Sequence, residues 1–484
     1  MSFFHGVRAI KGSGSQTVYG TASGIVAAVG TAPVNQVASY KSVVLARNMT
    51  EAKAALGYSD NWTKYTLCEV MYRHFQVEAM SPLLLINVAD PATQKTAVAA
   101  ASKTVVDGQV TLPEDTVLGS IEVKTVPGEG ETAQTLVKGQ DYDVFWQDGA
   151  CIVEAISGGS MDGLATVSVG YDTFSFDPAS AAMKTAVIGG TDTATGENKG
   201  LELLNDCYAM YSINPDIIIA PSFSSDSTVA AAMAARAESL NTVFRARAVV
   251  DADSATTRLY TAVPAWKAAN GITSDRQILC WPMGKKDGNT YHMSTVVASA
   301  MAATDAGNED CPSESPDNKP ALLDSLCLAD GTEIVLNLEK ANYLGGNGIV
   351  TALNMGGEFR VWGSHTAAYP NATAAEEIFI PVARMMDWVM NGLILTYWSR
   401  IGGKLNRRIC ESIADSASIW INGLTSAGHL YGGRAEFNAE ENPDADIMNG
   451  ILKIHVYLAP VHPLVEIDFI CEYDASYVSA ALTE

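Results

Sequence analysis

The chain has 484 residues and a formal net charge of −23, from 31 basic and 54 acidic side chains. This acidic balance argues against a nucleic-acid binder, because contacts to phosphates need clustered lysine and arginine. Hydrophobic residues make up 48% of the chain and charged residues only 18%, which fits a globular protein of several domains. So low a charge density has two explanations, a large buried core or extensive surfaces between subunits.

The eight cysteines and the start of the chain indicate a protein of a reducing cytoplasm. No two cysteines form a Cys-x-x-Cys pair, so neither a zinc site nor a redox motif is predicted. The first residues contain no basic region followed by an apolar stretch, and no run approaches the roughly 18 apolar residues of a membrane span. We therefore expect no secretory signal and no membrane insertion.

The chain opens with a polar stretch and continues as an α/β segment. Residues 1–20 are rich in glycine and serine and have no sustained period, which is typical of an extended arm or of an ordinary frayed terminus. Asn48 and Glu51 form a capping box at the start of a helix. Strands are expected at 25–29, 42–46 and 83–88, and helices at 48–57 and 62–79.

Residues 96–175 follow a different pattern. Short runs with period two are separated by glycine, proline and aspartate, and Asp148-Gly149 between two of them is a strong signal for a two-residue hairpin. We predict an inserted all-β domain over 96–175, either a sandwich or a small barrel.

Residues 178–344 return to strand–helix alternation, which predicts a middle α/β domain with a largely parallel sheet. Parallel sheets bind ligands at the carboxyl ends of their strands. Ser222, Asp251 and Asp253 follow two of the predicted strands, so they are candidates to hold a metal and a phosphate. The alternative is that these polar residues cap the helices that begin near 228 and 257. No phosphate loop, dinucleotide fingerprint or nucleophile elbow is complete anywhere in the chain.

The last quarter combines two helix patterns with two strand patterns. Apolar side chains recur every three or four residues from Val382 to Ile401, and a weaker series follows from 405 to 424. Residues 451–458 and 465–472 alternate apolar and polar side chains, which predicts a strand pair joined by a turn at 459–463. The predicted fold class is a multidomain α/β (α+β) protein. Its expected parts are a discontinuous α/β core domain (21–92 plus 345–472), the middle α/β domain (178–344) and the inserted all-β domain.

Four basic side chains lie within nine residues of this otherwise acidic chain, with no acid among them: Arg400, Lys404, Arg407 and Arg408. One explanation is that these cations stabilise the C-terminal end of a helix or form a solvated surface. The other is a docking patch for an acidic partner.

The order of several motifs resembles the tail sheath proteins of contractile-tailed bacteriophages and of R-type bacteriocins. The motifs are Phe4-His5-Gly6-Val7, the strand from Asp216 to Pro221, the run from Phe359 to Thr366, and the closing helices and strands. The resemblance covers most of the chain except about 95–175, and such insertions lie on the outer surface in sheaths. It implies a structural subunit without enzymatic activity or cofactor. Hexameric rings would stack helically around a tail tube and contract, driving the tube through the host cell envelope for genome ejection.

The resemblance also implies partners and contact residues. The partners would be further copies of the chain, the tail tube protein, and the baseplate and tail terminator proteins, in a virion tail assembled in the host cytoplasm, with no direct nucleic-acid contact. The basic cluster would face the tube. Arms at 1–20 and 473–484 would add strands to a neighbour's sheet. The strand-exchange candidates are Phe3, Phe4, Val7, Val18, Ile454, Val456, Ile467, Phe469, Tyr473, Tyr477 and Val478. The competing hypothesis is an α/β nucleotide-binding protein or hydrolase that uses the edge with Ser222, Asp251 and Asp253.

Overall fold

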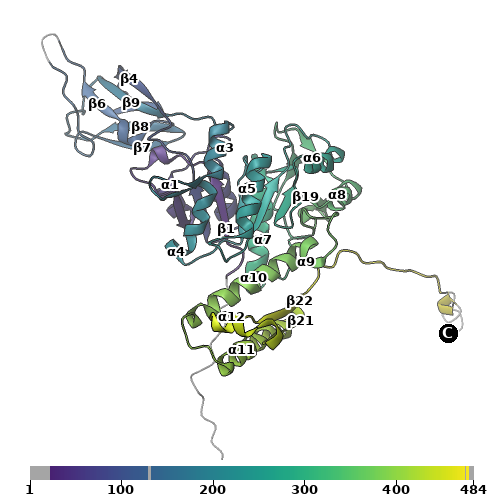
Figure 1. The fold of residues 1–484 in the computed structure, drawn as a ribbon. Coiled ribbons are helices and arrows are strands. Elements are labelled where there is room, and N and C mark those ends of the chain that lie inside the picture. The colour runs from purple at the N-terminus through teal and green to yellow at the C-terminus, as the bar shows by residue number, and fades with distance from the viewer. Residues whose placement is uncertain (1–21, 129–131, 475, 479–484) are drawn as a thin grey trace, which may run out of the picture.

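The computed structural model describes residues 22–128, 132–474 and 476–478, and an eight-stranded sheet forms its centre (Figure 1). The strand order is β2-β3-β1-β12-β13-β14-β19-β20. The six strands from β3 to β19 are parallel, and the outer strands β2 and β20 are antiparallel to their neighbours. The strands are β1 (Val26–Gly30), β2 (Val43–Ala46), β3 (Leu83–Asn87), β12 (Ile217–Ile219), β13 (Arg247–Asp251), β14 (Gln277–Cys280), β19 (Ile349–Met355) and β20 (Glu358–Trp362).

Apolar runs explain why these strands are central. β3 and β12 are fully buried, as expected for parallel strands that are covered on both faces. α7 is buried along most of its length and contacts β12, β13 and β14. The helices of this main body are α1 (Met49–Leu56), α2 (Thr66–Tyr72), α3 (Ala181–Ile188), α4 (Cys207–Tyr211), α5 (Ser227–Glu238), α6 (Val263–Ala269), α7 (Met293–Gly307) and α8 (Leu338–Gly345). Its small sheets contain β10 (Gly190–Thr191) with β11 (Asn198–Lys199), and β15 (Met283–Lys286), β16 (Asn289–His292), β17 (Ser325–Cys327) and β18 (Glu333–Ile334).

The expected middle domain at 178–344 is not a separate body, which corrects the domain division. β12, β13 and β14 come from this segment and lie between β1 and β19, so the segment shares one sheet and one hydrophobic core with 21–92. Periodicity identified the strands but not their partners, because parallel pairing joins segments that are far apart in sequence.

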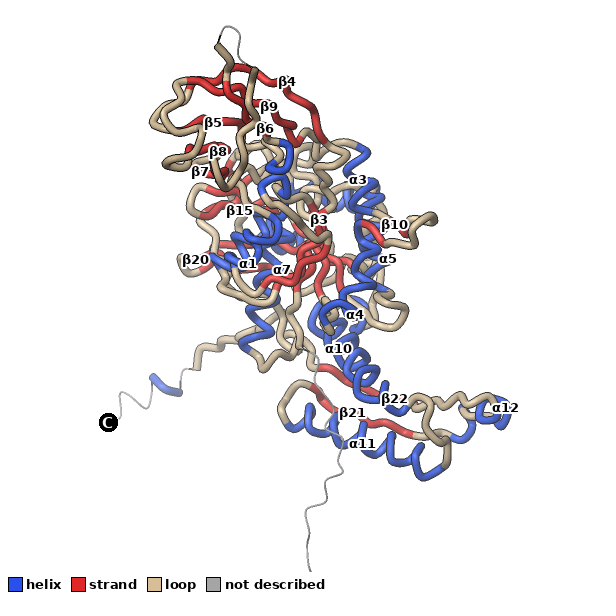
Figure 2. Tube along the Cα trace, turned by 90° about the vertical axis from the view of Figure 1, so that its left-hand side faces the viewer, coloured by secondary structure: helices blue, strands red, loops and turns tan. Residues whose placement is uncertain are grey.

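Residues 95–174 form an all-β unit that projects from one end of the main body (Figures 1 and 2). Its six strands form two three-stranded antiparallel sheets, β4-β9-β6 and β5-β8-β7, around a core of their own. At the β7–β8 hairpin, Asp148 and Gly149 both have positive φ, of 49° and 71°, as a type I′ turn requires. The strands are β4 (Lys95–Thr104), β5 (Gln109–Pro113), β6 (Glu122–Thr125), β7 (Tyr142–Gln147), β8 (Ala150–Ala155) and β9 (Thr166–Phe174).

The C-terminal subdomain, residues 380–460, lies at the other end of the main body (Figure 2). Its helices pack against a two-stranded sheet around a third hydrophobic core. Its elements are α10 (Ile380–Tyr397), α11 (Arg407–Ser426), β21 (Leu430–Glu436), α12 (Asp444–Met448) and β22 (His455–Pro460), and the short α9 (Ala375–Ile378) precedes it. Among the described residues, no helix has both the length and the apolar character needed to cross a membrane.

Candidate functional site

α10 joins the main body to the C-terminal subdomain, because its side chains belong to two cores. Ile380 packs in the main core, whereas Met385 and Val389 pack with α11 and β21. Pro381 near its first turn suits a helix start. The subdomain is therefore attached through a helix that both bodies share.

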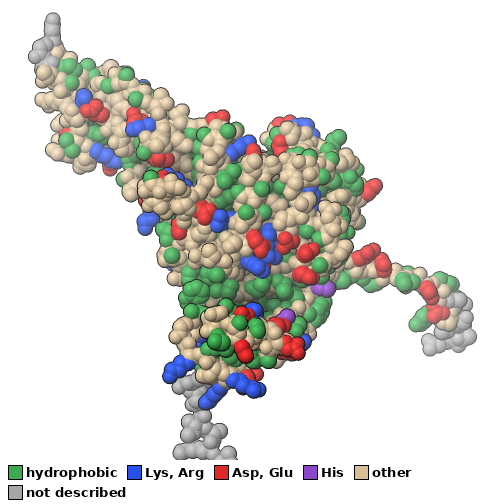
Figure 3. Space-filling model, viewed as in Figure 1, with side chains coloured by type: hydrophobic (Ala, Val, Ile, Leu, Met, Phe, Trp, Pro, Cys, Tyr) green, Lys and Arg blue, Asp and Glu red, His purple; other side chains and the backbone are tan. Residues whose placement is uncertain are grey.

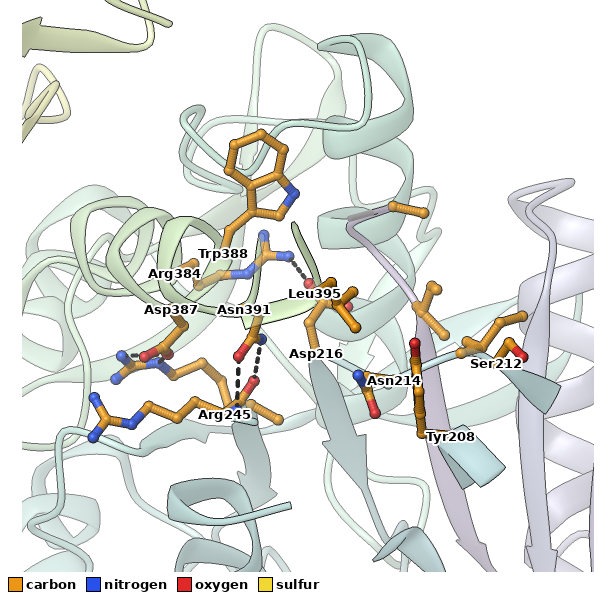
Figure 4. Close-up of a pocket in the computed structure, with 15 residues that line it drawn as sticks. Tyr208, Ser212, Asn214, Asp216, Arg245, Arg384, Asp387, Trp388, Asn391 and Leu395 are labelled. Atoms are coloured by element: carbon orange, nitrogen blue, oxygen red, sulfur yellow. Dashed lines mark hydrogen bonds and ion pairs between the residues drawn. The ribbon is translucent and has the colours of Figure 1, made fainter. Parts of the chain in front are cut away.

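Buried ion pairs fix this helix to the main sheet (Figure 4). Arg384 lies 2.5 Å from the carboxylate of Asp305 on α7 and 2.7 Å from that of Asp216, just before β12. Burial raises the pKa of Asp305 above its ordinary value, against the opposing charge of Arg384. One turn further along α10, Asp387 pairs with Arg247 at 2.6 Å and with Arg276 at 2.8 Å.

β22 pairs with β21 and not with residues 465–472, which corrects the predicted hairpin. The antiparallel register joins Gly433 to Leu458 and Ala435 to Val456. Gly433 approaches α11 so closely that a Cβ would lie 2.7 Å from Ile421 Cγ2. Sequence reasoning missed β21 because two adjacent glycines hide its alternation, although glycine within a strand is itself a sign of close backbone approach.

The C-terminal segment, residues 461–474, has no regular secondary structure and extends away from the subdomain (Figure 1). Its apolar side chains are exposed: Phe469 is 84% and Ile470 88% accessible. Residues 465–472, which the alternation predicts to be a strand, therefore pair with no strand among the described residues.

The strand-exchange candidates divide into three groups. Phe3, Phe4, Val7 and Val18 lie outside the described residues. Ile454 and Val456 are partly buried against the core of the C-terminal subdomain, so they belong to the sheet itself. The exposed candidates are Ile467, Phe469, Tyr473, Tyr477 and Val478. Ile467 and Phe469 were expected in the sheet that receives a strand, and the structure places them in the segment that leaves it.

The basic cluster lies in the turn between α10 and α11, at the tip of the subdomain farthest from the main body (Figure 3). Arg400, Lys404, Arg407 and Arg408 are all exposed. Arg407 lies 2.8 Å from Glu411 one turn along α11, and this hydrogen bond raises the pKa of Arg407. Arg400 lies in the last turn of the 3-10 segment Trp398–Arg400 that follows α10, where a cation suits the helix dipole, whereas Arg407 and Arg408 lie in the first turn of α11, where it does not. The helix-end explanation therefore applies to Arg400 but not to Arg407 and Arg408.

The polar groups at the carboxyl edge of the main sheet are already engaged. Asp251 accepts hydrogen bonds from Ser294 N and Oγ and from Ser224 Oγ, and burial raises its pKa. Asp253 accepts from Ala255 N and Thr256 Oγ1, as a turn-capping side chain does. Ser222 is exposed at the rim of a cavity of about 140 Å³ beside them.

This edge therefore offers little to a ligand. Its acids bind their own loops and helix starts, although the caps differ from those expected. Asp226 caps α5, Asp251 accepts from Ser294 at the start of α7, and Asp253 closes a turn, because no helix begins near 257 and α6 begins at Val263. Across the parts of the chain that the structure describes, no group of three or more His, Cys, Asp or Glu is placed to hold a metal ion.

Comparisons with known proteins concern the whole chain. No family model matches the chain. The tail sheath protein of Burkholderia phage BcepMu is 24% identical over 496 residues, which cover 99% of this chain and 98% of that protein.

Two solved structures of contractile systems share the fold. A chain of the anti-feeding prophage baseplate gives a TM-score of 0.56 at 12% identity, covering 98% of this chain and 100% of that one. The contracted sheath of the extracellular contractile injection system PVC gives 0.55 at 13% identity, covering 99% of both chains. In sequence and in fold, this chain is therefore similar to contractile tail sheath proteins over nearly its whole length.

Proposed function

We propose that this chain is the subunit of a contractile tail sheath whose copies are linked by donated strands. The observation that carries the proposal is the C-terminal segment, which presents a strand-like alternation of apolar side chains with nothing covering them among the described residues. A globular protein of one copy gains nothing from this exposure, because apolar surface is stabilised by removal from water.

The sheet β21–β22 is the acceptor in this proposal. A sheet of two strands is only marginally stable by itself, and further strands on its edges would extend the ladder of backbone hydrogen bonds. A segment that donates itself to the next copy makes a head-to-tail contact, which repeats without closing on a pair. Residues 1–20 are a second donor in the same scheme, with Phe3, Phe4, Val7 and Val18 as its apolar side chains.

Hexameric rings stacked into a helical sleeve around the tail tube would follow from such contacts. The extended sleeve would be held by a kinetic barrier, and contraction would bury more surface between subunits. At about 25 cal/mol per Å², a few hundred Å² of apolar surface releases several kcal/mol per subunit. Similarity to a chain of the anti-feeding prophage baseplate supports association with a baseplate as the place where contraction starts. The released energy would drive the tube through the host cell envelope, and the subunits would assemble in the host cytoplasm into the virion tail.

The basic cluster would face the tube. Its position at an exposed tip favours a role in contact with another molecule, because all four side chains are exposed to solvent there. Charges at the edge of an interface guide how two proteins meet and align more than they add to the affinity between them. A tail terminator protein would close the end of the sleeve. No observation favours the competing nucleotide-binding or hydrolase function, since Asp251 and Asp253 are occupied by protein donors.

Electron microscopy of the purified chain tests the proposal. We expect rings or tubes by negative stain from the full chain. A chain that ends at Pro460 keeps both strands of the acceptor sheet, so we expect a folded monomer with unchanged circular dichroism that does not polymerise. A small, discrete oligomer from the full chain would contradict the function, and tubes from the shortened chain would contradict strand donation by the C-terminal segment.

A further inference from the structure

A cleft of about 850 Å³ lies between the insertion and the main body, where the β7–β8 hairpin and the region around α1 both line it (Figure 1). Its volume lies within the range of roughly 300–1,000 Å³ that is usual for clefts that bind small ligands. The insertion contributes Glu114 and residues 146–149, and the main body contributes residues between 36 and 76. None of the lining residues belongs to α10 or to the sheet β21–β22.

Aromatic side chains line this cleft from both bodies. Trp146 comes from the insertion, and Tyr58 and Tyr72 come from the main body. All three are only partly buried, although each packs against a hydrophobic core of its own body. The ring of Trp146 is held in place, because its Nε1 donates to the carbonyl of Glu114 at 3.0 Å. Fixed and partly exposed rings of this kind offer flat apolar faces to a ligand.

Two buried polar atoms of the lining have no hydrogen-bond partner within the described part of the chain, Gln36 Nε2 and Tyr58 Oη. The amide oxygen of Gln36 accepts from Tyr58 N at 3.0 Å, which fixes the orientation of the amide and leaves its N–H donors unused. A buried donor without an acceptor costs free energy. A ligand that places an oxygen at this point would remove that cost.

The charges of the lining exclude an anionic ligand. Three acidic residues and one basic residue line the cleft, and the ammonium group of that basic residue, Lys53, already lies 4.2 Å from the centre of the Tyr58 ring. A phosphate ester or an acidic sugar would therefore be repelled. The uncharged polar side chains of the lining are Gln36, Ser59, Asn61, Gln76 and Gln147. Amides and hydroxyls both donate and accept hydrogen bonds, so they suit a ligand that carries several hydroxyl groups.

We propose that this cleft binds a short, neutral oligosaccharide of N-acetylated sugars. A sugar ring has a C–H face that packs on an aromatic ring, and its hydroxyls suit the amides and carboxylates of the lining. The acetamide group supplies a carbonyl oxygen for Gln36 Nε2, and Val37 and Met49 in the same lining are apolar partners for its methyl group. Binding of a glycan stands apart from the sheath function, so each can fail without the other.

Isothermal titration calorimetry of the full chain with N,N′,N″-triacetylchitotriose tests the proposal. We expect Trp146→Ala to weaken binding roughly tenfold. Gln36→Glu should weaken it by a similar factor, because it keeps the oxygen that holds Tyr58 N and removes the donor. Trp146→Phe keeps an aromatic face and should bind within about threefold of the wild type. Trp398→Ala, in the exposed turn between α10 and α11, is the matched control and should bind as the wild type does.

Two further probes identify the group that the cleft recognises. Maltotriose has sugar rings and hydroxyls without acetamides, and N-acetyl-trialanine amide has amide groups without sugar rings. We expect both to bind at least roughly tenfold more weakly than triacetylchitotriose. Equal affinity for either probe would overturn the proposal, and for the peptide it would assign the cleft to peptides. The absence of saturable binding of triacetylchitotriose, or binding that both Trp146→Ala and Gln36→Glu leave unchanged, would overturn it as well.

Discussion

His292 stands between two buried carboxylates at the carboxyl edge of the main sheet. Its Nδ1 lies 2.7 Å from Glu69 Oε2, and its backbone N donates to the other oxygen of Glu69 at 2.7 Å. Burial opposes the charged imidazole, but the charges of Glu69 and Asp251 and the hydrogen bond to Glu69 raise its pKa to about 9. The protein thus holds a histidine that is charged at neutral pH.

This pKa predicts a pH dependence of stability. A histidine whose pKa rises on folding stabilises the protein fully below pH 6.5, and the contribution is lost as the pH rises through 9. We expect the free energy of unfolding to decrease as the pH rises from 7 to 9.5. This group contributes up to roughly 1.4 kcal/mol per pH unit to the decrease. His292→Gln should flatten the profile in this window. Equal slopes for both proteins would show that other groups cause the dependence.

The ion pairs of α10 give a second prediction at this scale. Asp387→Asn removes the charge that Arg247 and Arg276 share in a buried site. We expect it to lower the free energy of unfolding by about 3–5 kcal/mol, because two buried cations lose their most buried partner and keep only the more exposed Asp275 and Glu238. Asp415→Asn on the exposed face of α11 is the control and should change it by less than about 0.5 kcal/mol. A small effect of the first substitution would mean that water already reaches these arginines.

At the scale of elements, helix periodicity was the reliable signal. The apolar series 382–401 and 405–424 correspond to α10 (Ile380–Tyr397) and α11 (Arg407–Ser426) to within a few residues. The strand pattern at 465–472 was also informative, but it was assigned the wrong partner. Alternation shows that one face of an extended segment is apolar. It does not show which strand the segment pairs with.

The exposed strand pattern predicts the effect of charge on assembly. Ile467→Asp with Phe469→Asp places two charges on the face that would pack in a neighbour's subdomain. We expect the tubes to be lost and the monomer's unfolding midpoint to stay the same, because both side chains are exposed in the single chain. Glu466→Gln with Asp468→Asn, on the alternate positions, is the matched control and should still form tubes. Tubes from the first variant would exclude this segment as the donated strand.

The basic cluster predicts a separable effect on tube binding. Arg400→Glu with Arg407→Glu reverses charge at the tip of the subdomain and should leave tubes of the sheath able to form. Their co-sedimentation with polymerised tail tube protein should fall at low salt, and the difference should shrink as salt screens the charges. Lys41→Glu with Lys138→Glu makes the same charge change at exposed sites elsewhere and should bind normally. Equal binding by both variants would place the tube contact on another surface.

At the scale of the whole molecule, the sequence predicted a mixed α/β chain with a β-rich insertion but not the single sheet at its centre. β12 pairs with β1, which ends 187 residues earlier (217 − 30), and β14 pairs with β19, which begins 69 residues later (349 − 280). Strand order in a parallel sheet depends on crossovers that leave no local pattern. For the candidate acids at the sheet edge, the sequence left ligand binding and capping as alternatives, and the hydrogen bonds of Asp251 and Asp253 identify the groups that they bind.

Besides its two chain connections, the insertion contacts the main body through the loop between β5 and β6. Asn35 Nδ2 donates to the carbonyls of Glu114 and Thr116, and Tyr65 OH donates to Asp115 at 2.6 Å. These contacts hold the loop between β5 and β6 against the main sheet, so the unit is docked rather than free. Its hydrophobic core is nevertheless its own.

Removal of the insertion is therefore predicted to leave a foldable subunit, provided that the cut respects the register. Lys95 and Phe174 are paired partners at the base of β4 and β9, and Phe174 is buried in the main core, so both must stay. Replacing residues 96–173 with Asn-Gly closes this base as a two-residue hairpin. We expect tubes of normal length from the shortened chain, because the donated segment, the acceptor sheet and α10 lie at the opposite end of the molecule (Figure 2).

The unfolding midpoint of the shortened chain should fall, since Asn35 and Tyr65 lose their partners, and Tyr65→Phe in the shortened chain should recover part of the loss. A shortened chain that folds but forms no tubes would show that the insertion takes part in contacts between subunits.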